Sequence, residues 1–128
     1  MDEDRAQLLR FERGEFDAHQ FAHREHLRMA FAMLRAYDFA EAAFRYSRAL
    51  RVMLERVARP QGFHQTITIA FLSLIAERLA ARDYADFESF VSDNGDLLDK
   101  SALGRWYRPK RLGSDAARST FLLPDMLP

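Results

Sequence analysis

The hydrophobic side chains of this chain recur mostly at helical spacing, and no stretch alternates cleanly as a β-strand does. β-branched residues are few, and glycine and proline are confined to a few points between long stretches of Ala, Leu, Arg, Glu, Phe and Met. Those residues favour helices, and Gly and Pro mark where helices end. The pattern therefore predicts an all-α fold.

The pattern divides the chain into three long helices and several shorter ones. The core helices are expected at about residues 17–37, 39–58 and 64–82. Smaller C-terminal helices and a docked tail are expected over residues 83–128, since the tail is too apolar to remain in solvent. The expected architecture is a single-domain helical bundle that covers residues 1–128.

Capping and breaking residues set these boundaries. Gly14 ends a short first helix, and Asp17 and Asp38 are suitable N-caps for the first two long helices. Pro60 and Gly62 separate the second long helix from the third. The third is apolar around most of its circumference, which is typical of the most buried helix in a bundle.

Composition excludes several classes of function. The 128 residues, 48% of them hydrophobic, can bury a core without help from disulfide bonds or structural metal ions. The lack of cysteine excludes disulfides, Cys-based zinc sites and thiol nucleophiles. Lys and Arg (19) balance Asp and Glu (19), so no global field attracts nucleic acid or an anionic membrane. No segment is apolar for long enough to span a bilayer, and the acidic start is unlike a signal peptide. A cytoplasmic location is expected.

Three of the four histidines lie within eight residues, as His19, His23 and His26. At about 100° per residue they fall within an arc of roughly 60° on a single helix. The same stripe continues through apolar residues such as Ala30, so the imidazoles extend the inward face of the helix. This interpretation requires that the helix begins before His19.

The path of the chain brings the fourth histidine to the same end of the bundle. A tight turn near Asp38 makes the first two long helices antiparallel, so His64 begins the third helix near the start of the first. Two imidazoles at i and i+3 with a third from a neighbouring helix can bind a divalent metal and leave positions open. We predict a site of His23, His26 and His64 for zinc, iron, nickel or manganese; catalysis is left open.

Other readings of the same residues stay open. The histidines can instead form a metal-free hydrogen-bonded cluster in a module that binds a small molecule or a protein, or forms a homo-oligomer. Thr66 and Thr68 either present hydroxyls near the histidines or belong to a helix start. Nucleic-acid binding by the basic stretch at 100–118, with its Trp106, ranks last because the chain has no net charge.

Five short segments, in this order, carry a resemblance over nearly the whole chain. They are FAHREHLR (21–28), FHQTIT (63–68), DNGDLL (93–98), WYRP (106–109) and FLLPD (121–125). The set resembles a family of small uncharacterised bacterial proteins whose members read roughly F-H-H-x-D-H-x-R, Y-H-E-T-x-T, N-P-D-L-L, Y-Y-x-P and F-V-L-P-D. The resemblance implies an all-helical single domain and no particular activity.

The resemblance also distinguishes candidate site residues that match the family pattern from those that do not. It matches His23, His26, Thr66 and Thr68, and it adds Arg28 as a supporting group, whereas His19 has no counterpart and is only a neighbour of the site. Two positions depart from the family pattern. Ala22 stands where the pattern has a histidine, and Gln65 stands where it usually has Glu. If that Glu is a ligand or base in the family, this chain has an altered site.

Overall fold

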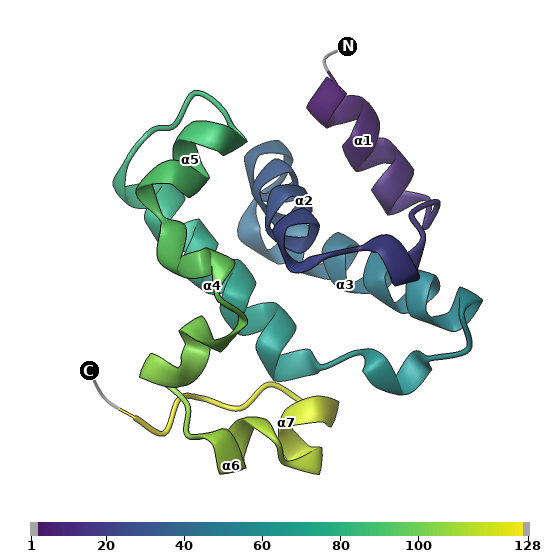
Figure 1. Cartoon of the computed structure of the whole chain (residues 1–128), viewed down its shortest axis with the longest axis vertical. Coiled ribbons are helices and arrows are strands. Elements are labelled where there is room, and N and C mark those ends of the chain that lie inside the picture. The colour runs from purple at the N-terminus through teal and green to yellow at the C-terminus, as the bar shows by residue number, and fades with distance from the viewer. Residues whose placement is uncertain (1–2, 127–128) are drawn as a thin grey trace.

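In the computed structural model, which describes residues 3–126, the secondary structure of these residues is entirely helical (Figure 1). The all-α prediction is confirmed. The α-helices are α1 (Glu3–Glu12), α2 (His23–Ala36), α3 (Phe39–Arg56), α4 (Gln65–Ala81), α5 (Phe87–Asp93), α6 (Pro109–Leu112) and α7 (Asp115–Ser119). Short 3₁₀ turns are η1 (Ala18–Gln20), η2 (Pro60–Gly62), η3 (Gly95–Leu98) and η4 (Lys100–Arg105).

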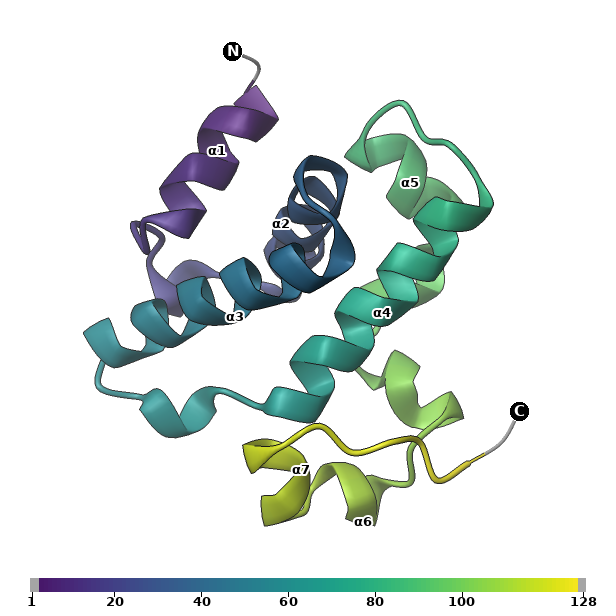
Figure 2. The same cartoon turned by 180° about the vertical axis from the view of Figure 1, so that it is seen from behind.

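The three longest helices, α2, α3 and α4, pack on one another and hold the rest of the chain. Helix α1 lies against α2 and α3, while α5 lies against the other side of α2. Figures 1 and 2 show α6, α7 and the C-terminal tail gathered near the beginning of α4, below the other helices in both views. Helix α4 therefore connects the N-terminal half of the molecule to its C-terminal segments, as α4 also contacts α7 and η4.

The second and third long helices lie close to their expected positions. The Asp38 carboxylate accepts the Glu41 backbone N–H at 2.9 Å, which confirms Asp38 as the N-cap of α3. Helix α4 begins one residue after His64, whose ring takes the N-cap role. The proline turn η2 separates the two helices as expected.

The predicted helix over 17–37 is wrong in its first turns, because the chain leaves the helix at Phe21 and Ala22 and α2 begins only at His23. Asp17 caps just the η1 turn. The rings of Phe16 and Phe21 both pack on Phe11, with centroids 5.9 and 5.5 Å away. The break before α2 lets the Phe21 ring turn back onto Phe11 and join Phe16 in one aromatic cluster.

The C-terminal part is more divided than the sequence predicts. The helix expected after residue 83 begins only at Phe87, where Asp86 and Ser89 form a capping box. Residues 100–105 form a 3₁₀ turn, and the helical segments that follow are the short α6 and α7, with Ser114 as the N-cap of α7. The N-caps of these short helices are Asp86, Asp99 and Ser114, whose side chains accept backbone N–H groups of the first turn.

The tail is docked, but through its backbone: the apolar side chains of Phe121 and Leu123 stay exposed, at 39% and 70%, contrary to the reason for expecting it to dock. The Tyr107 hydroxyl donates to the Leu122 carbonyl at 2.7 Å, and the Met126 N–H donates to the Trp106 carbonyl at 2.9 Å. The buried Thr66 hydroxyl donates to the Thr120 carbonyl at 2.8 Å and accepts the Leu122 N–H at 3.0 Å. Helix α4 therefore holds the tail directly.

Gly14 is required in the turn after α1. Its φ of +70° is a left-handed conformation that favours glycine, and an added Cβ would lie 2.5 Å from a methyl carbon of Val52. The Gly14 carbonyl also accepts a hydrogen bond from the Arg56 guanidinium. The turn is thus pressed onto α3.

A polar cluster around the buried Asn94 fixes the segment at 93–98. Asn94, 7% exposed, donates to the Phe90 carbonyl and the Tyr84 hydroxyl. Arg78 on α4 donates to the Asn94 side chain and to both oxygens of Asp96, at 2.6 and 2.8 Å. The cluster holds η3 against α4 and α5 and so positions the Leu97 carbonyl, which the site uses.

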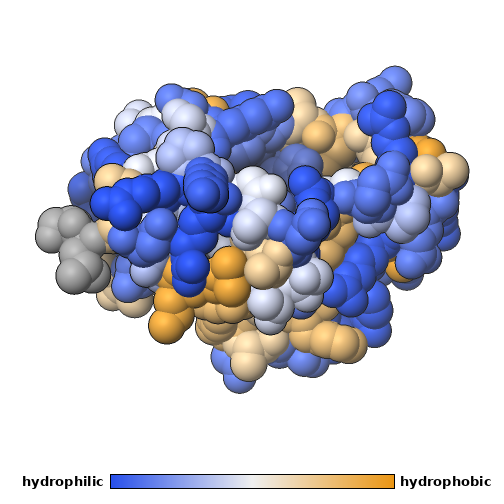
Figure 3. Space-filling model, turned by 90° about the horizontal axis from the view of Figure 1, so that it is seen from below, coloured by the Kyte–Doolittle hydropathy of each residue, from blue (hydrophilic) through white to orange (hydrophobic). Residues whose placement is uncertain are grey.

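None of the described helices is long and apolar enough to cross a membrane. The face seen from below is largely hydrophilic, with hydrophobic residues gathered along one side of the view (Figure 3). The exposed large hydrophobic side chains of residues 3–126 come from α3, α4, η3 and the tail: Phe39, Phe44, Ile67, Leu98, Phe121 and Leu123.

Candidate functional site

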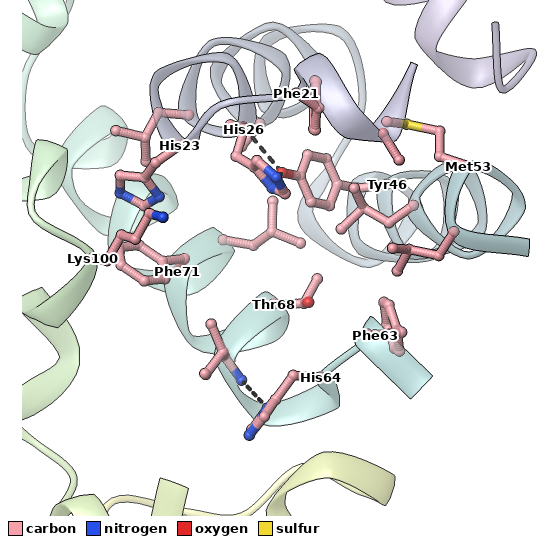
Figure 4. A pocket seen from close by; sticks show the side chains of 18 of the residues that line it. Phe21, His23, His26, Tyr46, Met53, Phe63, His64, Thr68, Phe71 and Lys100 are labelled. Carbon is pink, nitrogen blue, oxygen red and sulfur yellow. Dashed lines mark hydrogen bonds between the residues drawn. The ribbon is translucent and has the colours of Figure 1, made fainter. Parts of the chain in front are cut away.

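A cavity of about 660 Å³ lies between α2, α3 and α4 (Figure 4). Most of its lining is aromatic or aliphatic. The apolar lining residues include Phe21, Leu27, Ala30, Leu50, Met53, Leu54, Phe63, Ile67, Phe71, Leu72 and Ile75. The polar lining residues are His23, His26, Tyr46, Arg59, His64, Thr68 and Lys100. Three of the four histidines therefore border one cavity.

His26 lies on the α2 wall with its ring between Phe21 and the Tyr46 hydroxyl (Figure 4). The Phe21 and His26 ring centroids are 4.2 Å apart. Burial, and next the positive charge that His23 can carry, lower the pKa of His26 to about 4. Its imidazole is therefore neutral at pH 7. Tyr46 donates to the His26 backbone carbonyl at 3.0 Å, and burial raises the pKa of its hydroxyl, which stays protonated.

His23 begins α2 and connects it to η3. Its Nε2–H donates to the Leu97 carbonyl at 2.8 Å, and its ring meets that of Phe71 edge-on at 5.4 Å. Since Nε2 is occupied, only Nδ1 remains for another partner. His23 thus serves first as a structural contact between the cavity wall and the segment at 93–98.

His64 uses both ring nitrogens within the protein. Its Nδ1 accepts the Ile67 N–H at 3.0 Å, and its Nε2–H donates to the Leu112 carbonyl at 2.7 Å. These two bonds together fix the neutral tautomer with hydrogen on Nε2. Figure 4 shows His64 well separated from His26, across the cavity. The ring is an N-cap that also joins α4 to the end of α6.

Within residues 3–126, no group of three or more His, Asp or Glu side chains is placed to hold a metal ion. A site made of His23, His26 and His64 would require His64 to release a hydrogen bond at one of its nitrogens and the walls of the cavity to approach one another. Binding of zinc, iron, nickel or manganese therefore stays a prediction from the sequence. In this fold it would require a rearrangement of His64 and of the cavity walls.

The supporting residues separate into different roles. Thr68 lines the cavity, whereas Thr66 is fully buried beneath the tail. Arg28 lies outside the cavity lining and pairs with Glu25 at 3.0 Å and Asp4 at 3.4 Å. His19 is exposed in η1 and does not line the cavity, because the break before α2 removes it from the histidine stripe.

Several lining residues were not recognised as site residues from the sequence. Tyr46 and Phe71 fall on inward stripes and are indistinguishable there from ordinary core residues. Lys100 and Arg59 come from turns, for which helical periodicity gives no direction. A weak signal existed for Lys100, since Lys100 and Lys110 are the only lysines among 19 basic residues.

Comparison of the chain with protein-family models, with curated proteins and with solved structures gives no match.

Proposed function

We propose that this protein binds a small, mainly apolar molecule, without a metal ion, in the cavity between α2, α3 and α4. The observation that carries the proposal is the cavity itself, about 660 Å³ in volume and lined mostly by apolar side chains. Protein cores normally pack with few voids larger than a water molecule, while small-molecule sites typically measure about 300–1,000 Å³. The cavity is partly open to solvent and its volume lies within that range, so a small molecule can enter it and fit.

The polar groups of the lining support the same proposal. His26 is neutral at pH 7, because its pKa is lowered to about 4, so an apolar molecule meets no buried cation there. The Thr68 hydroxyl makes no hydrogen bond to any of the other described residues, and so can bond a ligand. A few polar groups in an apolar wall are the usual means of orienting a small molecule.

The test is a titration of the full chain with 4-phenyl-1-butanol, a neutral apolar probe, followed by amide chemical shifts. We expect saturable shifts at the lining residues Ala30, Thr68 and Ile75, and little change in α1. Thr68→Leu should weaken binding of the probe, because it removes the hydroxyl and puts a larger side chain into the cavity wall. The control is Ser73→Leu, which adds the same side chain at an exposed position of α4.

Two outcomes would contradict the proposal. In the first, the lining residues do not shift, or Thr68→Leu and Ser73→Leu bind the probe equally well. In the second, zinc binds at 1:1 and the ring signals of His23, His26 and His64 shift together. The second outcome would support the metal site instead, since those signals report directly on the coordinating nitrogens.

A further inference from the structure

The charges that line the cavity are all of one sign. Among the residues that the structure describes, the lining contains the cations Arg59 and Lys100 and no Asp or Glu, although acidic and basic residues balance over the chain as a whole. Both cationic side chains belong to exposed residues, so they lie at the rim and not on the apolar floor. A rim of this kind attracts an anion and leaves the interior suited to an apolar group.

Neither rim cation has a charged or hydrogen-bonding partner in the described part of the chain. Among residues 3–126, the Arg59 guanidinium and the Lys100 ammonium make no ion pair and no hydrogen bond. Asp99, next to Lys100, accepts the Ser101 N–H and O–H at one oxygen, Oδ1, at 2.8 Å each, and makes no ion pair with Lys100. Lys100 therefore has its charge available at the rim.

Other groups near Lys100 add positive potential at the same edge of the cavity. Figure 4 shows Lys100 at the same edge of the cavity as His23 and Phe71. Its charge also contributes, as the smallest of the causes, to the lowered pKa of His26. Ala22, the N-cap of α2, lines the cavity and provides no side-chain acceptor, so the positive end of that helix adds to the same field.

We infer that the molecule bound in this cavity carries one carboxylate, held at the rim by Lys100, with its apolar body among Phe71, Leu72 and Ile75. The inference rests on the proposed function and names the chemical class of the ligand. A single carboxylate fits because Lys100 supplies one strong donor group at this edge, with Arg59 as a second positive charge on the rim.

The experiment compares three probes of one skeleton on the full chain: 4-phenylbutanoate, 4-phenyl-1-butanol and 4-phenylbutylammonium. We expect the carboxylate to bind about 10-fold more tightly than the alcohol, and the ammonium most weakly. Lys100→Gln should reduce the advantage of the carboxylate to about 2-fold and leave the affinity for the alcohol unchanged. The matched control is Lys110→Gln, the other lysine, which is exposed on α6 away from the cavity.

The outcomes separate this inference from the proposed function. Equal binding of the carboxylate and the alcohol, or tightest binding of the ammonium, would overturn the inference while the apolar site stands. An unchanged carboxylate advantage in Lys100→Gln would do the same, and Arg59→Gln would then show whether the other rim cation acts instead. If none of the three probes binds, both the inference and the proposed function are wrong.

Discussion

At His26 the fold holds an imidazole in its neutral form, because burial and the nearby His23 both disfavour the charged ring. The pKa of His26 is lowered to about 4, whereas an unfolded chain has a histidine pKa of about 6.5. Between these values the unfolded state binds more protons than the native state. The free energy of unfolding therefore falls as pH is lowered from about 6.5 to 4, by at most roughly 3 kcal/mol from this residue.

The corresponding prediction uses His26→Phe, which keeps an aromatic ring beside Phe21 and removes the titrating group. The Tyr46 hydroxyl retains its bond to the backbone carbonyl of residue 26. We expect the variant to lose much less stability than the wild type between pH 6.5 and 4, as measured by urea denaturation at several pH values. His19→Phe, at an exposed histidine, should follow the wild type. Equal pH slopes for wild type and His26→Phe would show that His26 titrates normally.

Single residues of the site could be predicted from the sequence only in part. Helical spacing correctly placed His23 and His26 toward the interior, because spacing determines direction once a residue is on a helix. It did not reveal what the nitrogens bond to. The acceptor of His23 is a carbonyl 74 residues away and that of His64 is 48 residues away, and both contacts exist only after the whole chain has folded.

At the scale of elements, α4 and the tail are joined through one hydroxyl. Thr66 is fully buried, donates to the Thr120 carbonyl and accepts the Leu122 N–H. Thr66→Val preserves the shape of the side chain but leaves both backbone groups without this partner. We expect a loss of about 1–3 kcal/mol in the free energy of unfolding.

Trp106 gives a local measurement of the same change, since it is the only tryptophan and its carbonyl accepts the Met126 N–H. In Thr66→Val its fluorescence should respond to denaturant at a lower concentration than in the wild type. Thr68→Val is the matched control, because the Thr68 hydroxyl bonds no other described residue. If both variants lose equal stability, the buried hydroxyl does not hold the tail.

The elements that the sequence predicts well are those whose ends are set locally. Helix α3 begins after Asp38 because the capping bond spans only three residues. The break before α2 could not be predicted in this way, because it accompanies the packing of Phe21 on Phe11, which lies on another helix. The short C-terminal helices fall between these cases: their caps are local, but their extents depend on packing.

At the scale of the whole molecule, the cavity that is proposed to bind a ligand also lowers the stability of the free protein. Unfilled space forfeits the burial and contacts that an ordinary core would gain, and a ligand that enters it can restore them. A ligand that binds only the native state stabilises it, by about 1.4 kcal/mol when its free concentration is ten times Kd. The free protein should therefore be less stable than its fold allows.

Thr68→Leu tests this relation without any ligand. The substitution replaces a half-buried hydroxyl in the cavity wall by a larger apolar group and puts a better helix former within α4. We expect the free energy of unfolding of the unliganded protein to rise by about 1 kcal/mol, measured by urea denaturation. Adding 4-phenylbutanoate should then raise the denaturation midpoint of the wild type and of Ser73→Leu more than that of Thr68→Leu. A destabilised Thr68→Leu would mean that the space beside Thr68 cannot accept a side chain, and equal stabilisation of all three proteins would place the probe elsewhere. Higher stability of the unliganded protein together with weaker binding is the result expected if the cavity is both unfilled and used for binding.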